Sequence, residues 1–122
     1  MMLSWFIAGL KLVIMYQWGV DKALEMIERE QITNFVVVPT QSWDLVNSPS
    51  FEKFDTSSLR AVGGGGAPAP TSLVTKVANS VKQGTPQLGY GMTETTAFGP
   101  GLMGKDSLLH PPIPGRALLR IR

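Results

Sequence analysis

Short runs of apolar residues alternate along the chain with longer segments in which apolar positions recur every three to four residues. The continuous runs cover residues 12–16 (LVIMY), 34–39 (NFVVVP), 59–62 (LRAV) and 86–88 (PQL). Strands that are buried on both faces of a parallel sheet have unbroken apolar runs of this kind. We therefore expect a strand at each of these four places.

Three intervening segments have the apolar spacing of amphipathic helices. The first begins near Asp21, a favourable N-cap residue, and the second near Pro39. The third begins near Pro70, which suits a first helical turn, and Gly84 lies where that helix should end. The apolar positions of these three segments are Ala23, Leu24 and Ile27, then Trp43, Leu45 and Val46, then Leu73, Val74, Val77, Ala78 and Val81. This alternation predicts an α/β fold with a mostly parallel sheet and flanking helices.

The two ends of the chain have a different character. Residues 99–115 are rich in glycine and proline and should be mostly loop, and residues 117–121 should begin another strand. Because the sequence starts and stops inside such elements, we expect residues 1–122 to be a piece of a larger domain.

Residues 1–18 are apolar apart from Ser4, Lys11 and Gln17. A membrane-spanning helix needs about 20 apolar residues, and a signal peptide needs a basic start and a small-residue cleavage site. Gly9 and Lys11 interrupt this run, and it has no basic start. We favour a buried helix end, a turn at Gly9 and then a buried strand, with membrane contact as the alternative.

The composition of the chain limits the kinds of binding and catalysis that it can perform. The chain has 122 residues, of which 43% are hydrophobic, enough for one small packed domain. Its net charge is only +2 and its basic residues are scattered, which argues against nucleic-acid binding. It has no cysteine, which excludes thiolate chemistry and fits a cytoplasmic location, with peripheral membrane association as the alternative. The only histidine, His110, precedes Pro111 in an expected loop, and we interpret it as solvated rather than as a ligand or base.

Two glycine-rich loops each follow a predicted strand. Residues 63–68 (GGGGAP) form the first loop and residues 89–94 (GYGMTE) the second. Parallel strands end at the same edge of a sheet, and open α/β sheets bind ligands beyond that edge. Because glycine lets the backbone approach a ligand closely, we expect the two loops to meet at one ligand-binding rim.

The second loop also carries groups that suit a nucleotide. Tyr90 can stack on an adenine-sized ring, Thr93 can donate its hydroxyl to a phosphate oxygen, and the Glu94 carboxylate suits Mg²⁺. Each feature also has a plainer interpretation. The glycine run can be a flexible connector, and Thr93 and Glu94 can be a helix N-cap and a first-turn acid. The occurrence of both loops in order, on an α/β background, favours nucleotide binding.

The second loop resembles the YGMTE-type motif of adenylate-forming acyl-CoA synthetases, the AMP-dependent synthetase and ligase superfamily. Residues 9–21 (GLKLVIMYQWGVD), 32–40 (ITNFVVVPT), 58–68 (SLRAVGGGGAP) and 112–115 (PIPG) are similar to further segments of that family. The resemblance implies that residues 1–122 belong to the large N-terminal domain of such an enzyme. The family's phosphate loop is then expected upstream, and its C-terminal domain lies outside this segment.

The resemblance also implies a reaction and a site. A carboxylic acid, expected to be of the fatty-acid type, would attack ATP to give an acyl-adenylate, and coenzyme A would then displace AMP. The nucleotide would be bound by Gly65, Gly66, Ala67, Pro68, Gly89, Tyr90, Gly91, Met92 and Thr93, and Mg²⁺ by Glu94. Trp43 and residues 95–101 would line the acyl tunnel. No catalytic residue is assigned within this chain.

The sequence departs from the family pattern in two places. Leu88 stands where relatives often carry glutamine, and His110-Pro111 stands where they carry Gly-Arg. The family's phosphate-loop lysine and adenylation lysine have no counterpart here, so the isolated chain is expected to show little or no turnover. Two alternatives stay open: a non-catalytic nucleotide-binding module, and a fragment that associates with a membrane or partner through its apolar N-terminus. The residues also leave open which acid is used and whether the acceptor is coenzyme A or another thiol.

Overall fold

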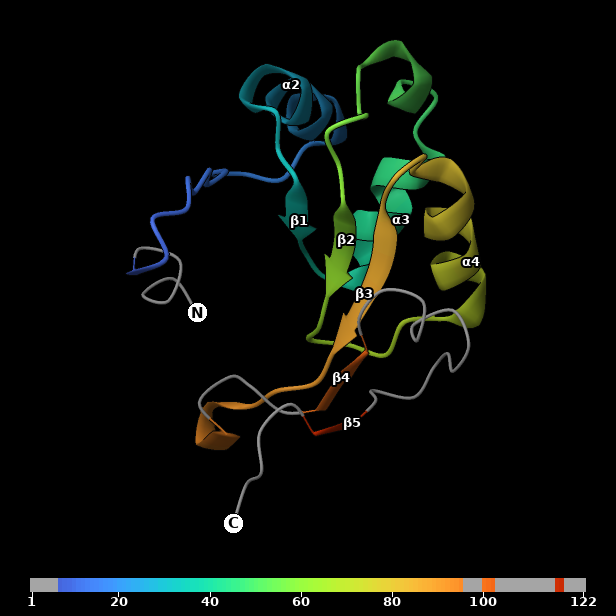
Figure 1. Cartoon of the computed structure of the whole chain (residues 1–122). Coiled ribbons are helices and arrows are strands. Elements are labelled where there is room, and N and C mark those ends of the chain that lie inside the picture. The colour runs from blue at the N-terminus through green and yellow to red at the C-terminus, as the bar shows by residue number, and fades with distance from the viewer. Residues whose placement is uncertain (1–6, 96–99, 103–115, 118–122) are drawn as a thin grey trace.

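The computed structural model describes residues 7–95, 100–102 and 116–117. The helices are α2 (Val20–Glu30), α3 (Pro39–Asn47) and α4 (Thr71–Ser80), with two one-turn 3₁₀ helices, η1 (Phe51–Lys53) and η2 (Thr93–Thr95). The strands are β1 (Asn34–Val36), β2 (Ala61–Gly64), β3 (Thr85–Gly89), β4 (Pro100–Leu102) and β5 (Arg116–Ala117). Helices and strands alternate from α2 to β3 (Figure 1).

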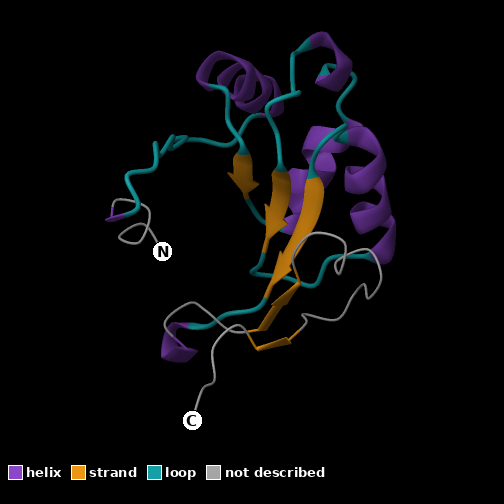
Figure 2. Cartoon of the chain, viewed as in Figure 1, coloured by secondary structure: helices purple, strands orange, loops and turns teal. Residues whose placement is uncertain are grey.

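The strands form one sheet in the order β1-β2-β3-β4-β5. The first three are parallel, with Val62 of β2 opposite Phe35 of β1 and Pro86 of β3. β4 and β5 add two short antiparallel strands beyond β3. The predicted α/β class is therefore confirmed (Figure 2). Because β1, β2 and β3 are parallel, their carboxyl ends lie at the same edge, which is the lower edge in the view of Figure 1.

Helices α3 and α4 lie on one side of the parallel strands, and α2 lies near their amino ends (Figure 1). The buried core joins these layers through residues Ala23, Leu24 and Ile27 of α2, Leu45 and Val46 of α3, Leu73, Val74 and Val77 of α4, and Leu59, Val62, Ala69 and Val81. Most apolar positions expected from the sequence are in this cluster. Trp43 of α3 is not in this cluster and is 43% exposed.

Proline and glutamine define the start of α3. Pro39 occupies the first turn, where its missing N–H costs no helical hydrogen bond. The N–H of Val38 donates to Gln41 Oε1 at 3.3 Å, which satisfies one backbone donor at the helix start. Pro70 similarly precedes α4, where the N–H of Leu73 donates to its carbonyl oxygen at 3.0 Å. Both predicted proline-led helices are confirmed.

The predicted strand at residues 12–16 is wrong. These residues have no regular secondary structure, and Ile14 and Tyr16 are exposed. An apolar run becomes a strand only when a neighbouring strand completes its hydrogen bonds, and no described strand pairs with this segment. Instead, Lys11 Nζ lies 2.5 Å from Glu30 Oε2, which ties the segment to the end of α2.

The start of α2 also differs from the prediction. Gly19, not Asp21, is the N-cap residue, and the N–H of Ala23 donates to the Gly19 carbonyl at 2.9 Å. Asp21 lies within the first turn, where its negative charge is favourable to the helix dipole.

Near the C-terminal end, residues 100–102 form β4 within the segment expected to be mostly loop. The remainder of that expected loop, including His110, lies outside the described residues, as do residues 118–121 of the last predicted strand. β5 includes the first residue of that strand, Ala117. Among the described residues, no helix has both the length and the apolar character needed to span a bilayer.

Candidate functional site

The carboxyl end of β2 is built from glycines that leave no room for side chains. A Cβ atom on Gly63 would overlap the carbonyl oxygen of Gln87, and one on Gly64 would lie 2.6 Å from the carbonyl oxygen of Val37. One on Gly65 would lie 2.5 Å from the carbonyl oxygen of Gly89. Close packing of the backbone against both neighbouring strands therefore requires glycine here.

The same residues continue into the first loop in an ordered way. The N–H of Val37 donates to the Gly63 carbonyl at 3.1 Å, which extends the β1–β2 pairing past β1. Gly63 and Gly66 have φ values of 133° and 91°, which side-chain-bearing residues rarely adopt. Gly63 and Gly64 belong to β2, so the glycine run is not simply a flexible connector. Gly66, Ala67 and Pro68 follow as exposed residues of the loop.

The second loop continues from the end of β3. Gly89, Tyr90, Gly91, Met92, Thr93 and Glu94 are all exposed. The Tyr90 hydroxyl donates to Met92 Sδ at 3.5 Å, and the tyrosine side chain is 52% exposed. Thr93 and Glu94 are the first two residues of η2. They therefore lie at the start of a helical turn, and the capping alternative stays open.

The two predicted loops do meet. β2 and β3 are adjacent parallel strands, with Gly64 paired to Leu88. Beyond that pair, the backbones of Gly65 and Gly89 touch. The structure thus joins the two loops at one rim through Gly65 and Gly89. Tyr90, Thr93 and Glu94 come after Gly89 along the chain, and Gly66, Ala67 and Pro68 come after Gly65. The chain after this junction therefore carries an aromatic ring, a hydroxyl and a carboxylate.

The donor set at the rim limits how a metal ion could be held. Glu94 is the one acidic side chain of the second loop, and the described residues contain no group of three His, Cys, Asp or Glu side chains placed to hold a metal. Mg²⁺ commonly takes one or two carboxylates and completes its shell with phosphate oxygens and water. The single carboxylate of Glu94 therefore fits a magnesium ion that arrives with a phosphate.

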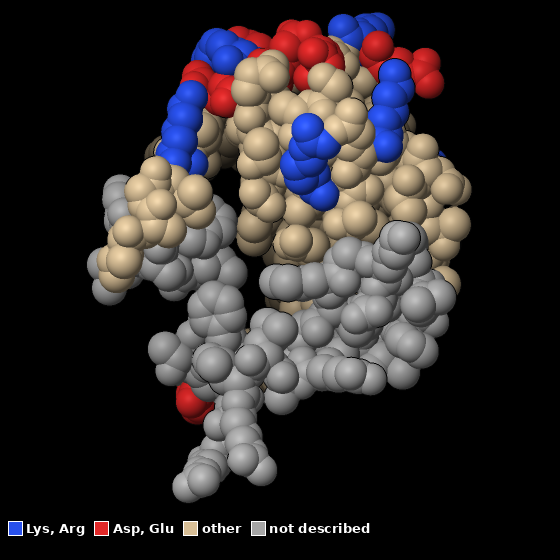
Figure 3. Space-filling view, in the orientation of Figure 1, with Lys and Arg blue, Asp and Glu red and all other residues tan. Residues whose placement is uncertain are grey.

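Charged side chains gather at the opposite end of the parallel strands, over α2 and η1 (Figure 3). There a hydrogen bond from Lys11, supported by one from Arg29, lowers the pKa of Glu30 below its ordinary value. These groups lie at the amino ends of the strands, away from both glycine loops (Figure 1), and we assign them to the surface rather than to the site.

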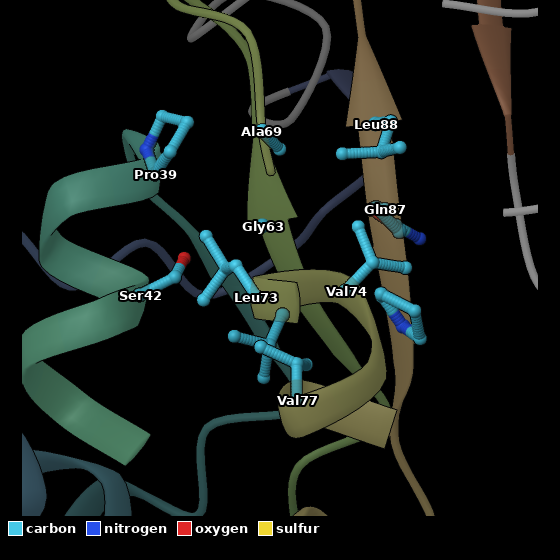
Figure 4. A pocket seen from close by; sticks show the side chains of 12 residues that line it. Pro39, Ser42, Gly63, Ala69, Leu73, Val74, Val77, Gln87 and Leu88 are labelled. Atoms are coloured by element: carbon cyan, nitrogen blue, oxygen red, sulfur yellow. The ribbon is translucent and has the colours of Figure 1, made fainter. Parts of the chain in front are cut away.

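A small hollow lies between β2, β3 and the helices α3 and α4 (Figure 4). Residues that line it include Gly63 and Gly64 of β2, Leu88 of β3 and Ser42 of α3. Ser42 is 2% exposed, and within the described residues its Oγ has no hydrogen-bond partner. The sequence analysis missed this residue, because a single serine in a helix carries no pattern that reveals an unpaired hydroxyl.

Trp43 is not one of the residues that line this hollow. Its ring lies on the surface under Lys76, whose Nζ is 5.7 Å from the ring centroid and also bonds to Asn47. The proposed contribution of Trp43 to an acyl tunnel stays a prediction, as does that of residues 95–101, of which 96–99 lie outside the described residues.

Comparison with known protein families gives one match that spans nearly the whole chain. The family model described as "AMP-binding enzyme" matches residues 1–120. The 4-coumarate–CoA ligase CCL1 of Humulus lupulus is 34% identical over 86 residues, which cover 70% of this chain and 16% of that protein. The mitochondrial medium-chain acyl-CoA ligase ACSF2 of Mus musculus is 36% identical over 75 residues, 62% of this chain and 12% of that protein. The chain thus spans only a small part of the curated relatives it matches.

Solved structures give the same grouping. The N-terminal domain of FACL13 from Mycobacterium tuberculosis is similar with a TM-score of 0.84 and 28% identity, over 93% of this chain and 28% of that one. O-succinylbenzoate coenzyme A synthetase from Bacillus subtilis, in complex with ATP and magnesium ion, is similar with a TM-score of 0.81 and 26% identity. That similarity covers 95% of this chain and 23% of the neighbour.

Proposed function

Because this chain belongs to the family of AMP-binding enzymes, we propose that it forms part of the nucleotide site of an ATP-dependent carboxylate–CoA ligase. The observation that carries the proposal is the contact between Gly65 and Gly89, which joins two side-chain-poor loops at the carboxyl ends of adjacent parallel strands. That edge is where open α/β sheets bind ligands. Bare backbone there lets a planar base approach the peptide groups closely.

In this proposal each loop has a distinct task. Gly65, Gly66, Ala67 and Pro68 border the adenine or the adenylate from the β2 side, and Gly89, Tyr90, Gly91 and Met92 border it from the β3 side. The exposed ring of Tyr90 supplies a face on which adenine stacks. Thr93, at the start of η2, donates its hydroxyl to a phosphate oxygen. The residues thus bind and orient the nucleotide, and none of them is assigned a proton-transfer step.

Glu94 supplies the carboxylate that holds Mg²⁺ beside the phosphates. When bound, the ion neutralises phosphate charge that develops during transfer. The protein's part is to present one carboxylate next to the Thr93 hydroxyl, at an exposed position that phosphate and water can reach.

The acid is proposed to be of the fatty-acid type and the acceptor to be coenzyme A. The similarity to a medium-chain acyl-CoA ligase supports this choice, whereas the similarity to a 4-coumarate–CoA ligase keeps aryl acids as the competing class. A panel of medium-chain and hydroxycinnamic acids, assayed for acyl-CoA with the protein that contains this segment, separates the two. Residues 1–122 alone, which contain no assigned catalytic residue, are expected to form no acyl-CoA.

Calorimetric titration with Mg-ATP tests the nucleotide site directly. Thr93→Val is expected to weaken binding by about tenfold, the loss of one hydrogen bond to a charged group. Glu94→Gln is expected to weaken it by at least as much, because the neutral amide is a poorer Mg²⁺ ligand than the carboxylate. Glu52→Gln is the matched control, because Glu52 is an exposed acid of the other 3₁₀ helix, η1. Affinity that is unchanged in both Thr93→Val and Glu94→Gln would remove the proposed site.

A second candidate function is supported by the N-terminal segment. Ile7, Leu10, Ile14 and Tyr16 are exposed to 81%, 58%, 66% and 102%, and clustered exposed apolar residues commonly mark an interface. Association with a membrane or a partner protein through this segment is compatible with the ligase proposal. Flotation with liposomes, compared between the protein and its Ile7→Ser/Ile14→Ser variant, distinguishes membrane contact from partner contact.

A further inference from the structure

The hollow between β2, β3, α3 and α4 is lined by one buried hydroxyl whose hydrogen-bond partner is not among the described residues. Ser42 is almost fully buried, at 2% exposure, and its Oγ bonds to no group among the described residues. In Figure 4 this oxygen points from α3 into the space beside Ala69, Gly63 and Leu73. A buried hydroxyl without a partner lowers stability by at least as much as one ordinary hydrogen bond raises it. Such groups are therefore nearly always hydrogen-bonded.

The size of the hollow identifies what can satisfy the hydroxyl. The space measures about 20 Å³, and roughly 10–15 Å³ is enough for one water molecule. The methyl-bearing side chains Val62, Leu73, Val74 and Val77 line much of the remaining wall. These side chains belong to the packed core, which resists changes of even one methylene group.

A water molecule needs more than one polar partner to be held in such a place. Gly63 and Gly64 line the hollow from β2 and have no side chain that would cover their peptide groups. A carbonyl oxygen has two lone pairs, so one that already serves the sheet can accept a second hydrogen bond. The site therefore offers a hydroxyl from α3 and bare backbone from β2.

We propose that this hollow is a binding site for one ordered water molecule, which Ser42 Oγ holds and which bridges α3 to the backbone at Gly63 and Gly64. The bridge lies directly behind the strand that leads into the first loop. Ser42 is thus a positioning residue. It holds β2 at a fixed distance from α3 and does not itself reach the rim. The proposal does not depend on which ligand the rim binds.

A high-resolution crystal structure of the protein tests the site directly. The expected result is a water peak about 2.8 Å from Ser42 Oγ, and its absence from the structure of the Ser42→Ala variant. An empty hollow in the unsubstituted protein, or a Ser42 hydroxyl bonded to the Val38 carbonyl instead, would overturn the proposal.

The stability of the Ser42→Ala variant gives a second test. The sign of its change distinguishes a hydroxyl bonded to water from an unpaired one. If water satisfies the hydroxyl, Ser42→Ala loses a hydrogen bond and raises the unfolding equilibrium constant by about fivefold. If the hydroxyl is unpaired, its removal leaves stability unchanged or increases it. Ser72→Ala, at an exposed position of α4, is the control and is expected to have little effect. Amide exchange at Gly63 and Gly64 should also accelerate in Ser42→Ala and not in Ser72→Ala. A neutral or stabilising Ser42→Ala substitution counts against the water.

Discussion

Gly65 and Gly89 touch through their backbones, but the contact is not symmetric. A methyl group on Gly65 would lie 2.5 Å from the Gly89 carbonyl oxygen, whereas one on Gly89 would come no closer than 3.8 Å to the Gly64 carbonyl oxygen. Neither residue has a positive φ. Space alone, and not backbone conformation, therefore distinguishes the two positions.

This asymmetry predicts unequal losses of stability for two substitutions in one contact. Gly65→Ala should destabilise the protein by about 1–3 kcal/mol, because the strand ends must separate to admit the methyl group. Gly89→Ala should cost well under half of that, since its methyl group meets only ordinary contacts. Urea denaturation of the two variants measures the difference. Equal costs for both would mean that the two loops do not pack as described.

The order of helices and strands was predictable because local sequence and tertiary packing agree in the middle of the chain. The run at residues 34–39 is rich in β-branched residues, and its first three residues form β1 of the parallel sheet. Pro39 begins α3, and Pro70 is the N-cap residue of α4. The meeting of the two glycine loops was predictable for a topological reason, since both follow parallel strands that proved to be neighbours.

What the sequence could not reveal depends on partners that are distant along the chain. Residues 12–16 have the composition of a strand, but that composition does not show whether a neighbouring strand is present to pair with them. The Ser42 hydroxyl is buried, without a partner among the described residues, only because α3, β2 and α4 pack together. The roles of Thr93, Glu94 and the other rim residues in binding stay predictions, because geometry places them without showing what they hold.

Tyr90 offers a test of the adenine side of the proposed site. Tyr90→Ala is expected to weaken Mg-ATP binding by roughly fivefold, because stacking on an aromatic face contributes about 1 kcal/mol. Tyr90→Phe keeps the ring and removes only the hydroxyl that bonds to Met92 Sδ, so its affinity should stay close to that of the unsubstituted protein. Titration of both variants by calorimetry checks this. A loss in Tyr90→Phe as large as in Tyr90→Ala would assign the effect to the hydroxyl rather than to stacking.

The ion pair between Lys11 and Glu30 predicts a pH-dependent attachment of the N-terminal segment. The hydrogen bond from Lys11 lowers the pKa of Glu30 below its ordinary value of 4.5. A lowered carboxyl pKa stabilises the folded state above the ordinary value, and this contribution is lost as the pH falls through the lowered value. Lys11→Gln should therefore raise the pKa of Glu30 towards 4.5 and reduce the acid sensitivity of the segment.

Carboxyl titration by NMR measures this shift, and Asp55 provides an internal control. The pKa of Asp55 is also lowered, chiefly by hydrogen bonds from the side chain and the backbone of Ser57. Lys11 does not take part in these hydrogen bonds. Its titration should stay unchanged in Lys11→Gln. A Glu30 titration that also fails to move would place Lys11 away from α2 in solution.

Gly84 lies in the turn between α4 and β3, and its role can be isolated by a double-mutant cycle. A Cβ atom on Gly84 would overlap Val81 Cγ1 and lie 3.4 Å from the Leu59 carbonyl oxygen. Gly84→Ala should therefore destabilise the protein, because Val81 is only 2% exposed and has little space in which to move. In a Val81→Ala background the overlapping methyl group is gone, so the same substitution should cost less. Because residues in contact couple by about 0.5–3 kcal/mol, we expect a favourable coupling energy of about 1 kcal/mol from urea denaturation of the four proteins. Strictly additive effects would mean that Gly84 is required for the turn itself and not for the space occupied by Val81.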